Sequence, residues 1–211
     1  YPPSELAVFE LNFMLVESIG RLPREAFGAA ARGDVVFERW SEKHLESTAQ
    51  LIAQSYHWHV DSQINDQYES VAGARRFLHN ITHYPGCGAF HYPAAMAAID
   101  RWEGELCGIS LASLVGPRVG HLTQVCVSPP MRGRGIGSEL LWRSTQAFCA
   151  AGGEAISLTV TASNTGAVQL YERIGFRTIR RFRAYVWKGL AGSAGYSVFF
   201  GAAEATRLPS E

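Results

Sequence analysis

The chain has 211 residues, enough for one domain of ordinary size with a buried core. Apolar residues make up 47% and charged residues 18%, which is typical of globular chains, and no apolar run approaches the ~20 residues of a membrane-spanning helix. Lys plus Arg and Asp plus Glu are each 19, so no net charge recruits nucleic acid or an anionic membrane, and we expect neither as a partner.

The N-terminal residues carry a mixed apolar pattern that we interpret as an extension covering residues 1–34. Its stretch ELAVFELNFMLVESI is helix-like, and Pro23 and Gly33 interrupt the pattern that follows. Residues 35–190 then form one domain. Residues 191–211 form a C-terminal tail rich in Gly, Ala and Ser, for which we expect partial order at best.

The domain itself alternates predicted strands and helices. In its first half we predict a strand (residues 35–40) and two helices (41–54 and 65–79). A meander of four strands follows (88–91, 95–100, 106–115 and 120–127). In its second half we predict a helix (residues 139–151), a β-branched strand (156–161), a helix (163–174) and one or two last strands (176–187).

The segment SPPMRGRGIG joins the strand 120–127 to the helix 139–151. A glycine turn that runs into a helix leaves backbone N–H groups unpaired, and the helix dipole adds partial positive charge, so the segment suits a pyrophosphate. Gly135 and Gly137 would let phosphates approach the backbone without a Cβ in the way. The spacing matches neither GxGxxG, because Ser138 takes the third position, nor a P-loop. A plain tight turn is the alternative interpretation.

A second motif, LTVTASNTGAVQLYERIGF, begins in the strand 156–161. Together with the Arg-x-x-Gly-x-Gly of Arg132, Gly135 and Gly137, it resembles the GNAT superfamily of acyl-CoA-dependent N-acetyltransferases. The match is close over roughly residues 120–176 and looser over 35–187. The resemblance implies an α/β (α+β) fold with a mixed, mostly antiparallel sheet that is splayed in the middle, helices on both faces, and acetyl-CoA bound as the acyl donor.

The resemblance also implies which residues bind acetyl-CoA. In the family, the strand before the glycine turn offers backbone groups to the pantetheine arm and to the acetyl carbonyl, where a preorganised N–H meets the charge that develops on attack. The turn itself contacts the pyrophosphate. The matching strand residues are Val125, Cys126 and Val127, and the matching turn residues are Arg132, Gly133, Arg134, Gly135, Ile136, Gly137 and Ser138.

Asn164 and Tyr171 are close to two helical turns apart, so their side chains face the same way. The resemblance implies that Asn164 holds the amide-bearing arm of the cofactor and that Tyr171 is the acid that protonates the departing thiolate. The alternatives are a helix cap for Asn164 and a core tyrosine with a satisfied hydroxyl for Tyr171.

The general base is the least defined part of the predicted site. Many family members use a glutamate on one of the two central strands, but this chain has Thr159 on the later strand, and His121 and Gln124 on the earlier one. His121 matches a position where some relatives keep a base, and an imidazole suits neutral pH. Gln124 cannot act as a base, although it could orient a water or the acceptor. A surface histidine at a strand end is the alternative for His121.

The connection SYHWHVDSQINDQY, between the first two helices of the domain, is the predicted acceptor-binding segment, since the family uses this region for the amine. Carboxylates could attract a cationic amine, and a tryptophan could stack on it. The purely structural alternative is that Tyr56 and Trp58 pack in the core while the histidine and aspartate residues cap helices. No metal is expected, because a His-x-His pair without a third ligand is a poor site. The candidates are His57, Trp58, His59, Asp61 and Asp66.

We therefore predict an N-acetyltransferase that moves an acetyl group from acetyl-CoA to a primary amine of a small molecule or peptide by direct attack. A ping-pong route through Cys126 is an alternative, although a strand cysteine is ordinarily a small buried hydrophobe. Because a glutamate base is missing, a non-catalytic acyl-CoA-binding sensor or interaction module is an alternative function. A nucleotide-dependent enzyme is a third candidate.

The four cysteines form no CxxC pair, which favours reduced thiols and a cytoplasmic location. The amine and the oligomeric state, a homodimer included, stay open.

Overall fold

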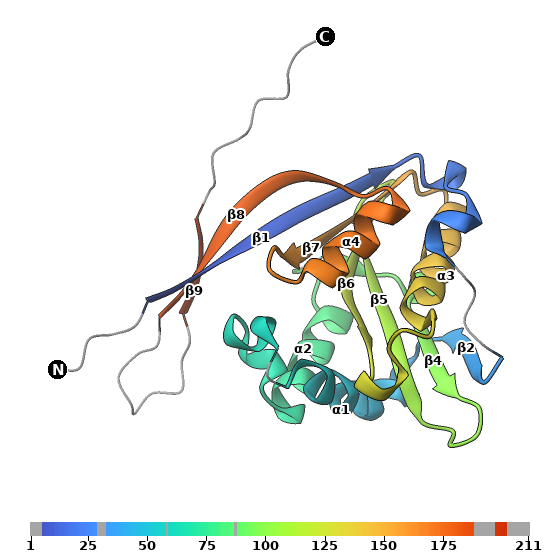
Figure 1. Cartoon of the computed structure of the whole chain (residues 1–211), viewed down its shortest axis with the longest axis horizontal. Helices are drawn as coiled ribbons and strands as arrows, with labels where there is room; N and C mark the ends of the chain where they lie inside the picture. Colours follow the sequence, from blue (N-terminus) through green and yellow to red (C-terminus); the bar gives the residue numbers. More distant parts are fainter. Residues whose placement is uncertain (1–5, 29–32, 58, 87, 188–196, 202–211) are drawn as a thin grey trace, which may run out of the picture.

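The computed structural model describes residues 6–28, 33–57, 59–86, 88–187 and 197–201 (Figure 1). In this part of the chain, nine strands form one sheet in the order β2-β4-β5-β6-β7-β1-β8-β9, with β3 paired to β5. Of the described neighbours, β6 and β7 run parallel and the other pairs run antiparallel. The strands are β1 (Leu6–Glu17), β2 (Val35–Arg39), β3 (Ala89–Phe90), β4 (Met96–Asp100), β5 (Leu106–Gly116), β6 (Val119–Val127), β7 (Ala155–Thr161), β8 (Arg177–Trp187) and β9 (Ser197–Gly201).

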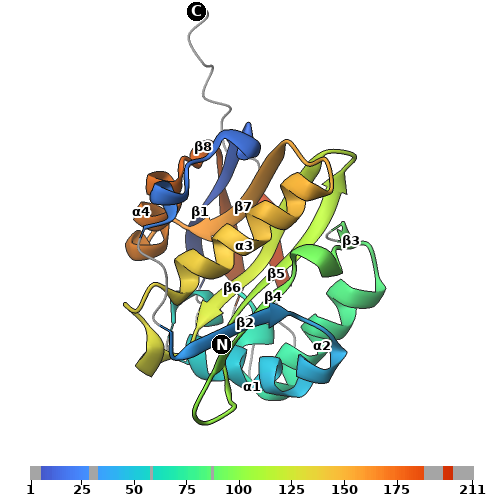
Figure 2. The ribbon, with the colours of Figure 1, turned by 90° about the vertical axis from the view of Figure 1, so that its right-hand side faces the viewer.

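Helices cover both faces of this sheet. Ala97 and Ile109 pack against α1 and α2, whereas Ala98 and Cys107 pack against α3, and alternate residues of a strand point to opposite faces. Figures 1 and 2 accordingly show α3 and α4 on one face and α1 and α2 on the other. Of the described helices, none has the length and apolarity that a membrane span needs. The α-helices are α1 (Leu45–Tyr56), α2 (Val71–His83), α3 (Ile136–Ala150) and α4 (Thr165–Ile174).

The N-terminal residues form an interior strand of the sheet. β1 pairs antiparallel with β7 on one side and with β8 on the other. Met14 and Val16 are buried in the core below α3 and α4, and Leu11 is buried on the opposite face. The helix prediction for this stretch is wrong, because an apolar run of this kind takes its conformation from its neighbours, and here two strands supply hydrogen bonds. The domain boundary at residue 34 stays a prediction, although β1 shares its sheet with residues 35–187.

β6 and β7 separate halfway along their length. Their pairing ends at Leu122 opposite Leu158, but β6 continues to Val127 and β7 to Thr161. The next residue of β6, Thr123, is an extra residue in the pairing with β5. A bulge of this kind bends a strand, so β6 turns away from β7 beyond Leu122. The predicted mostly antiparallel sheet, splayed between these two strands, is confirmed, and the widening gap is called the opening below.

The elements predicted within residues 35–187 are present, with shifted ends. α3 begins at Ile136, ahead of the predicted residue 139, so the glycine turn runs directly into the helix. α2 begins at Val71 instead of residue 65, because the residues before it form two short 3-10 turns, η4 (Val60–Gln63) and η5 (Asp66–Tyr68). Ser70 then caps α2 by accepting a hydrogen bond from the Gly73 N–H.

Candidate active site

The glycine turn joins β6 to α3 at the wide end of the opening. Gly133 and Gly135 have φ angles of 74° and 79°, in the left-handed region that favours glycine. A backbone hydrogen bond from Glu139 N–H to Gly135 C=O (3.0 Å) closes the first turn of α3. The amides of residues 136–138 precede this bond and so have no acceptor within the helix. Together with the helix dipole, these amides form a site suited to an anion.

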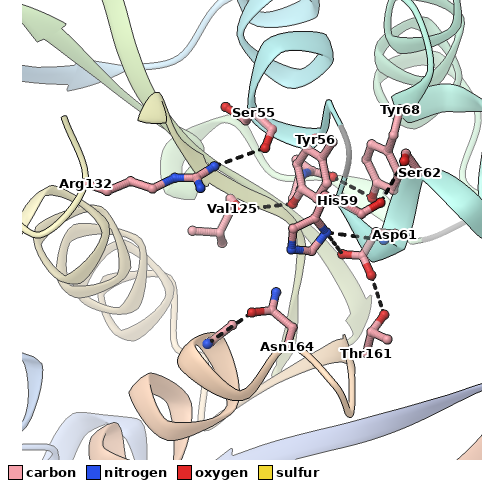
Figure 3. Close-up of polar contacts among 12 residues, drawn as sticks. Ser55, Tyr56, His59, Asp61, Ser62, Tyr68, Val125, Arg132, Thr161 and Asn164 are labelled. Carbon is pink, nitrogen blue, oxygen red and sulfur yellow. Dashed lines mark hydrogen bonds and ion pairs between the residues drawn. The ribbon is translucent and has the colours of Figure 1, made fainter. Parts of the chain in front are cut away.

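The arginine side chains of the turn hold its shape. Arg132 donates from Nε to the Val127 carbonyl (3.1 Å) and from Nη2 to the Ser55 carbonyl (3.0 Å), which ties the turn to β6 and to the end of α1 (Figure 3). Arg134 is paired with Asp34. These bonds fix the two guanidinium groups beside the turn, and the backbone amides of the turn are further donors that it offers to an anion.

A pocket of about 560 Å³ lies along the turn. This volume falls in the range of cofactor sites. The short turn η2 (Arg24–Phe27) contributes part of its wall, which means that the N-terminal segment helps to build this pocket. The pocket is lined by Phe27, Gly28, Val127, Met131, Arg132, Gly133, Gly135, Ile136, Gly137, Ser138, Leu170 and Arg173.

The free edge of β6 presents backbone groups to the opening. The carbonyls of Val125 and Val127 accept bonds from the side chains of Tyr56 (3.4 Å) and Arg132, whereas the Ser128 N–H bonds to β5. In an antiparallel pair, the N–H and C=O of one residue point to the same edge and those of its neighbour to the other. The amides of Val125 and Val127 therefore point into the opening. The amide of Cys126 points toward β5, so of the three residues predicted to bind the cofactor, two offer N–H groups there.

Asn164 begins α4 on the β7 side of the opening. Its Oδ1 accepts the Ala167 N–H (3.3 Å), which is the capping role given above as the alternative. The cap uses the carbonyl oxygen, and Figure 3 shows the amide nitrogen pointing away from α4 toward the opening. Capping and cofactor binding are thus compatible, because the two roles use different atoms.

Tyr171 lies further along α4, with its ring against Phe176 (centroids 5.7 Å apart). Burial, with smaller contributions from Asp61 and Cys126, raises the pKa of Tyr171 to about 12. The phenol therefore keeps its proton throughout the neutral range. Among the described residues its hydroxyl has no hydrogen-bond partner, so its proton is available to a bound molecule.

His121 projects from β6 to the face that carries α1 and α2. Its Nδ1 lies 2.9 Å from Ser157 Oγ, and the Ser157 hydroxyl donates to the Gly120 carbonyl (3.2 Å). A hydroxyl has one proton, so this network assigns the hydrogen of His121 to Nδ1 and leaves Nε2 as an acceptor. Burial lowers the pKa of His121 below its usual value, so the ring is neutral at pH 7. Phe13 of β1 stacks on it (centroids 6.3 Å apart).

Three polar side chains form a directed chain across the same face. The Tyr68 hydroxyl donates to Gln124 Oε1 (3.0 Å), and Gln124 Nε2 donates to the Tyr56 hydroxyl (2.7 Å). Tyr56 in turn donates to the Val125 carbonyl (Figure 3). The bulge at Thr123 brings Gln124 onto the face that His121 occupies. Gln124 is 4% exposed, so its amide is fixed by these two bonds. Tyr56 and Tyr68 both lie in the predicted acceptor-binding segment, but neither was among its candidate residues, because no local pattern links them to Gln124 of β6.

The connection between α1 and α2 closes over the opening through η4. His59 Nδ1 accepts the Asp61 N–H (3.2 Å), and the Thr161 hydroxyl donates to Asp61 Oδ1, which ties the connection to the end of β7 (Figure 3). His57 is exposed at the end of α1. Trp58 and the side chain of Asp66 lie outside the described part of the chain. The helix-capping alternative holds for His59, while Asp61 reaches the opening.

A cavity of about 250 Å³ lies below this connection, and it is called the loop cavity here. It is lined by a carboxyl group and by hydroxyl, amide and apolar side chains, which come from four strands and from the connection between α1 and α2. β1 and β8 form one wall, which no sequence motif indicated. The lining residues are Leu11, Asp61, Ile64, Asn65, Tyr68, His121, Leu122, Thr123, Thr159, Thr161 and Phe182.

Cys126 is buried on the α1 side of β6, at 7% exposure. Burial raises the pKa of its thiol to about 12, so the thiolate that a ping-pong route requires is scarce at neutral pH. Its environment is that of a structural cysteine. Within the described residues, no three His, Cys, Asp or Glu side chains gather in a way that could hold a metal ion.

The unpaired end of β6 leads into the glycine turn and faces α4, the helix that carries Tyr171. Residues 52–176 match the Acetyltransferase (GNAT) family. The chain belongs to this family. The match runs from α1 through the glycine turn to the end of α4, and so includes both sides of the opening.

One sequence relative matches part of the chain, and solved structures resemble most of its fold. The chain is 39% identical over 71 residues to "N-alpha-acetyltransferase MAK3" of Arabidopsis thaliana, a stretch that spans 34% of this chain and 37% of that protein. Its fold resembles a GCN5-related N-acetyltransferase from Sphaerobacter thermophilus (TM-score 0.61, 17% identity), over 89% of this chain and 54% of that one. It also resembles a PaiA N-acetyltransferase from Thermoplasma acidophilum in complex with coenzyme A (TM-score 0.51, 14% identity), over 80% and 99%. At such identities the structures establish the fold alone.

Proposed function

We propose that this protein is an N-acetyltransferase that moves an acetyl group from acetyl-CoA to a primary amine by direct attack. The observation that carries the proposal is the opening between β6 and β7, where the unpaired edge of β6 leads into the glycine turn on one side and faces α4 on the other. The 39% identity to an N-alpha-acetyltransferase supports the same reaction class.

Acetyl-CoA is a substrate in this proposal, and the chain's residues fit it. The amides of residues 136–138 and the left-handed Gly133 and Gly135 would hold the pyrophosphate in the turn pocket. The Asn164 amide nitrogen would meet the amide-bearing arm. The N–H groups of Val125 and Val127 would polarise the acetyl carbonyl, as an oxyanion hole does for charge that develops on attack.

Two side chains would then handle the protons. His121 Nε2, or a water that it orders, would take the proton that the amine loses as its nitrogen bonds to the acetyl carbon. Tyr171 would give its proton to the thiolate as the carbon–sulfur bond breaks. The geometry supports these roles, because His121 has an acceptor atom and is neutral, and Tyr171 has an unpartnered, protonated hydroxyl.

A screen of amines with acetyl-CoA, following release of the thiol, tests the proposal. Thiol release that depends on the amine is the expected result. CoA binding by calorimetry with no turnover across a broad panel would instead favour a non-catalytic acyl-CoA-binding module. Tight binding of NAD or ATP, with none of CoA, would favour a nucleotide-dependent enzyme.

The cellular location is a further part of the proposal. Cys107, Cys126 and Cys149 are free thiols, and reduced cysteines favour the cytoplasm. The acceptor in this proposal is the primary amine of a small molecule or a peptide.

A further inference from the structure

The face of the sheet that carries α1 and α2 is covered by these helices over only part of its width. The two helices pack on β4, β5 and β6, in a cluster that includes Ala97, Ile109 and Cys126. In the buried cluster on the β1 and β8 part of the same face, the one residue from outside the sheet is Ile64, of the connection between α1 and α2. An acceptor that enters the loop cavity can therefore extend over β1 and β8.

Arg180 of β8 projects from this face beside the loop cavity. Thr159 of β7 lies opposite Phe13 of β1, and Phe13 lies opposite Arg180. Residues directly opposite one another in antiparallel strands share a face, and Phe13 stacks on His121 on the face of α1 and α2. Because Thr159 lines the loop cavity, the Cα atom of Arg180 lies about 10 Å, or two strand spacings, from a wall of that cavity.

The charge of Arg180 is unpaired. Its guanidinium is exposed and forms no ion pair or hydrogen bond among the described residues. Asp61, the carboxylate that lines the cavity, is held by the Thr161 hydroxyl and lies 3.4 Å from His59 Nδ1. Arg177, at the start of β8, projects from the same face and adds a second exposed cation. A carboxylate is the group that matches the planar fork of an arginine.

We propose that the acceptor is an amine that carries a carboxylate, and that Arg180 binds this carboxylate while the amine lies in the loop cavity beside His121. This inference rests on the proposed acetyl transfer and names its acceptor class. The path from His121 to Arg180 runs over the ring of Phe13, whose centroid lies 6.3 Å from that of His121. An apolar ring suits the methylenes that separate the two ends of such an acceptor. Arg180 determines specificity at the end that does not react.

Two pairs of amines, each alike in shape but different in charge, test the proposal: 6-aminohexanoate with 6-aminohexanamide, and the dipeptide amide Ala-Glu with Ala-Gln. We expect kcat/KM for the carboxylate to exceed that for its neutral partner by about fivefold at low ionic strength in at least one pair, which is the range of an exposed ion pair. The pair that turns over faster identifies the acceptor as a small molecule or a peptide. Equal or higher kcat/KM for the neutral member of both pairs would overturn the proposal.

Arg180→Gln provides the specific test. It should lower the preference for the carboxylate to less than about twofold, because glutamine keeps a polar side chain and removes the charge. Arg181→Gln is the matched control and should keep the preference of the parent protein. Arg181 is also exposed and is the next residue of β8, but it projects from the other face, opposite Asn12. Equal preferences in the two variants would show that Arg180 does not bind the acceptor.

A binding measurement separates the failure of this inference from the failure of the proposed reaction. If none of the amines releases thiol, NMR titration of each amine into the CoA-saturated protein still compares their affinities. Tighter binding of the carboxylate, by about fivefold in the parent protein and not in Arg180→Gln, would support the inference while the reaction is rejected. Equal affinities within both pairs, or a preference that Arg180→Gln retains, would overturn the inference.

Discussion

The two sides of the opening use different parts of the polypeptide for recognition. On the side that we propose for the cofactor, the glycine turn and β6 present backbone amides, while Arg132 and Arg134 hold the turn. On the side that we propose for the acceptor, the polar groups are side chains that come from β6, β7 and the connection between α1 and α2. Backbone amides suit a donor that is the same in all members of a family, because they do not depend on side-chain identity. Side chains suit an acceptor that differs between proteins of one fold. Changes on the two sides should therefore have separable effects.

The largest effect is expected from Tyr171→Phe, which removes the proposed acid and keeps the ring. We predict that kcat falls by about 10²–10⁴-fold, the usual contribution of a positioned acid, while the affinity for CoA measured by calorimetry stays within about threefold. Tyr84→Phe, at an exposed tyrosine, is the matched control. Unaltered turnover in Tyr171→Phe would mean that another group protonates the thiolate.

The next largest effect is expected from His121→Asn, which keeps a hydrogen-bond donor toward Ser157 and removes the base. We predict a loss of about 10²-fold in kcat/KM at pH 7.5. Because burial lowers the pKa of His121, the imidazole is neutral above its folded pKa, and the activity of the parent protein should fall only below pH 6.5 as the ring takes up a proton.

The same variant gives a readout in its pH profile. The acidic limb assigned to His121 should disappear in His121→Asn, and it should persist in the control His79→Asn, an exposed position on α2. If the limb persists in both variants, water or another residue is the base, and His121 has a packing role against Phe13.

Gly135→Ala should act on the cofactor side alone. A side chain at the φ of 79° costs about 1–2 kcal/mol, and any shift of the turn moves the amides that follow. We predict that KM for acetyl-CoA rises about tenfold, with no change in the preference among amines. Gly20→Ala, where an added Cβ meets no atom within 4 Å, is the control. A change in amine preference would show that the two sides of the opening are coupled.

The smallest effect is expected from Tyr56→Phe, and it should appear first in stability. This change leaves the buried Gln124 Nε2 without an acceptor and the Val125 carbonyl without its donor. We predict that the free energy of unfolding falls by about 1–3 kcal/mol in a urea titration. Tyr92→Phe, whose hydroxyl contacts Glu42 at the surface, should change it by less than about 0.5 kcal/mol. Equal losses in both variants would indicate that the Tyr68–Gln124–Tyr56 chain adds little.

The sequence by itself predicted the side of the opening that we propose for the cofactor, because that side depends on local chemistry. Gly133 and Gly135 are required where the backbone is left-handed, and the order of strand, glycine turn and helix follows directly along the chain. The motif that contains Asn164 and Tyr171 indicated the family for the same reason, since both residues lie on one helix. The predicted splay also followed from this resemblance.

Only the tertiary structure decided the acceptor side and the place of the N-terminal residues. The loop cavity joins Leu11 to Phe182 and Asp61 to Thr161, and pairs so distant in sequence carry no local pattern. The bulge at Thr123 changes which face each residue of β6 occupies, so alternation alone cannot place Gln124 beside His121. β1 is a strand because β7 and β8 provide hydrogen-bond partners on both sides. The apolar sequence of β1 alone does not predict that these two strands will flank it.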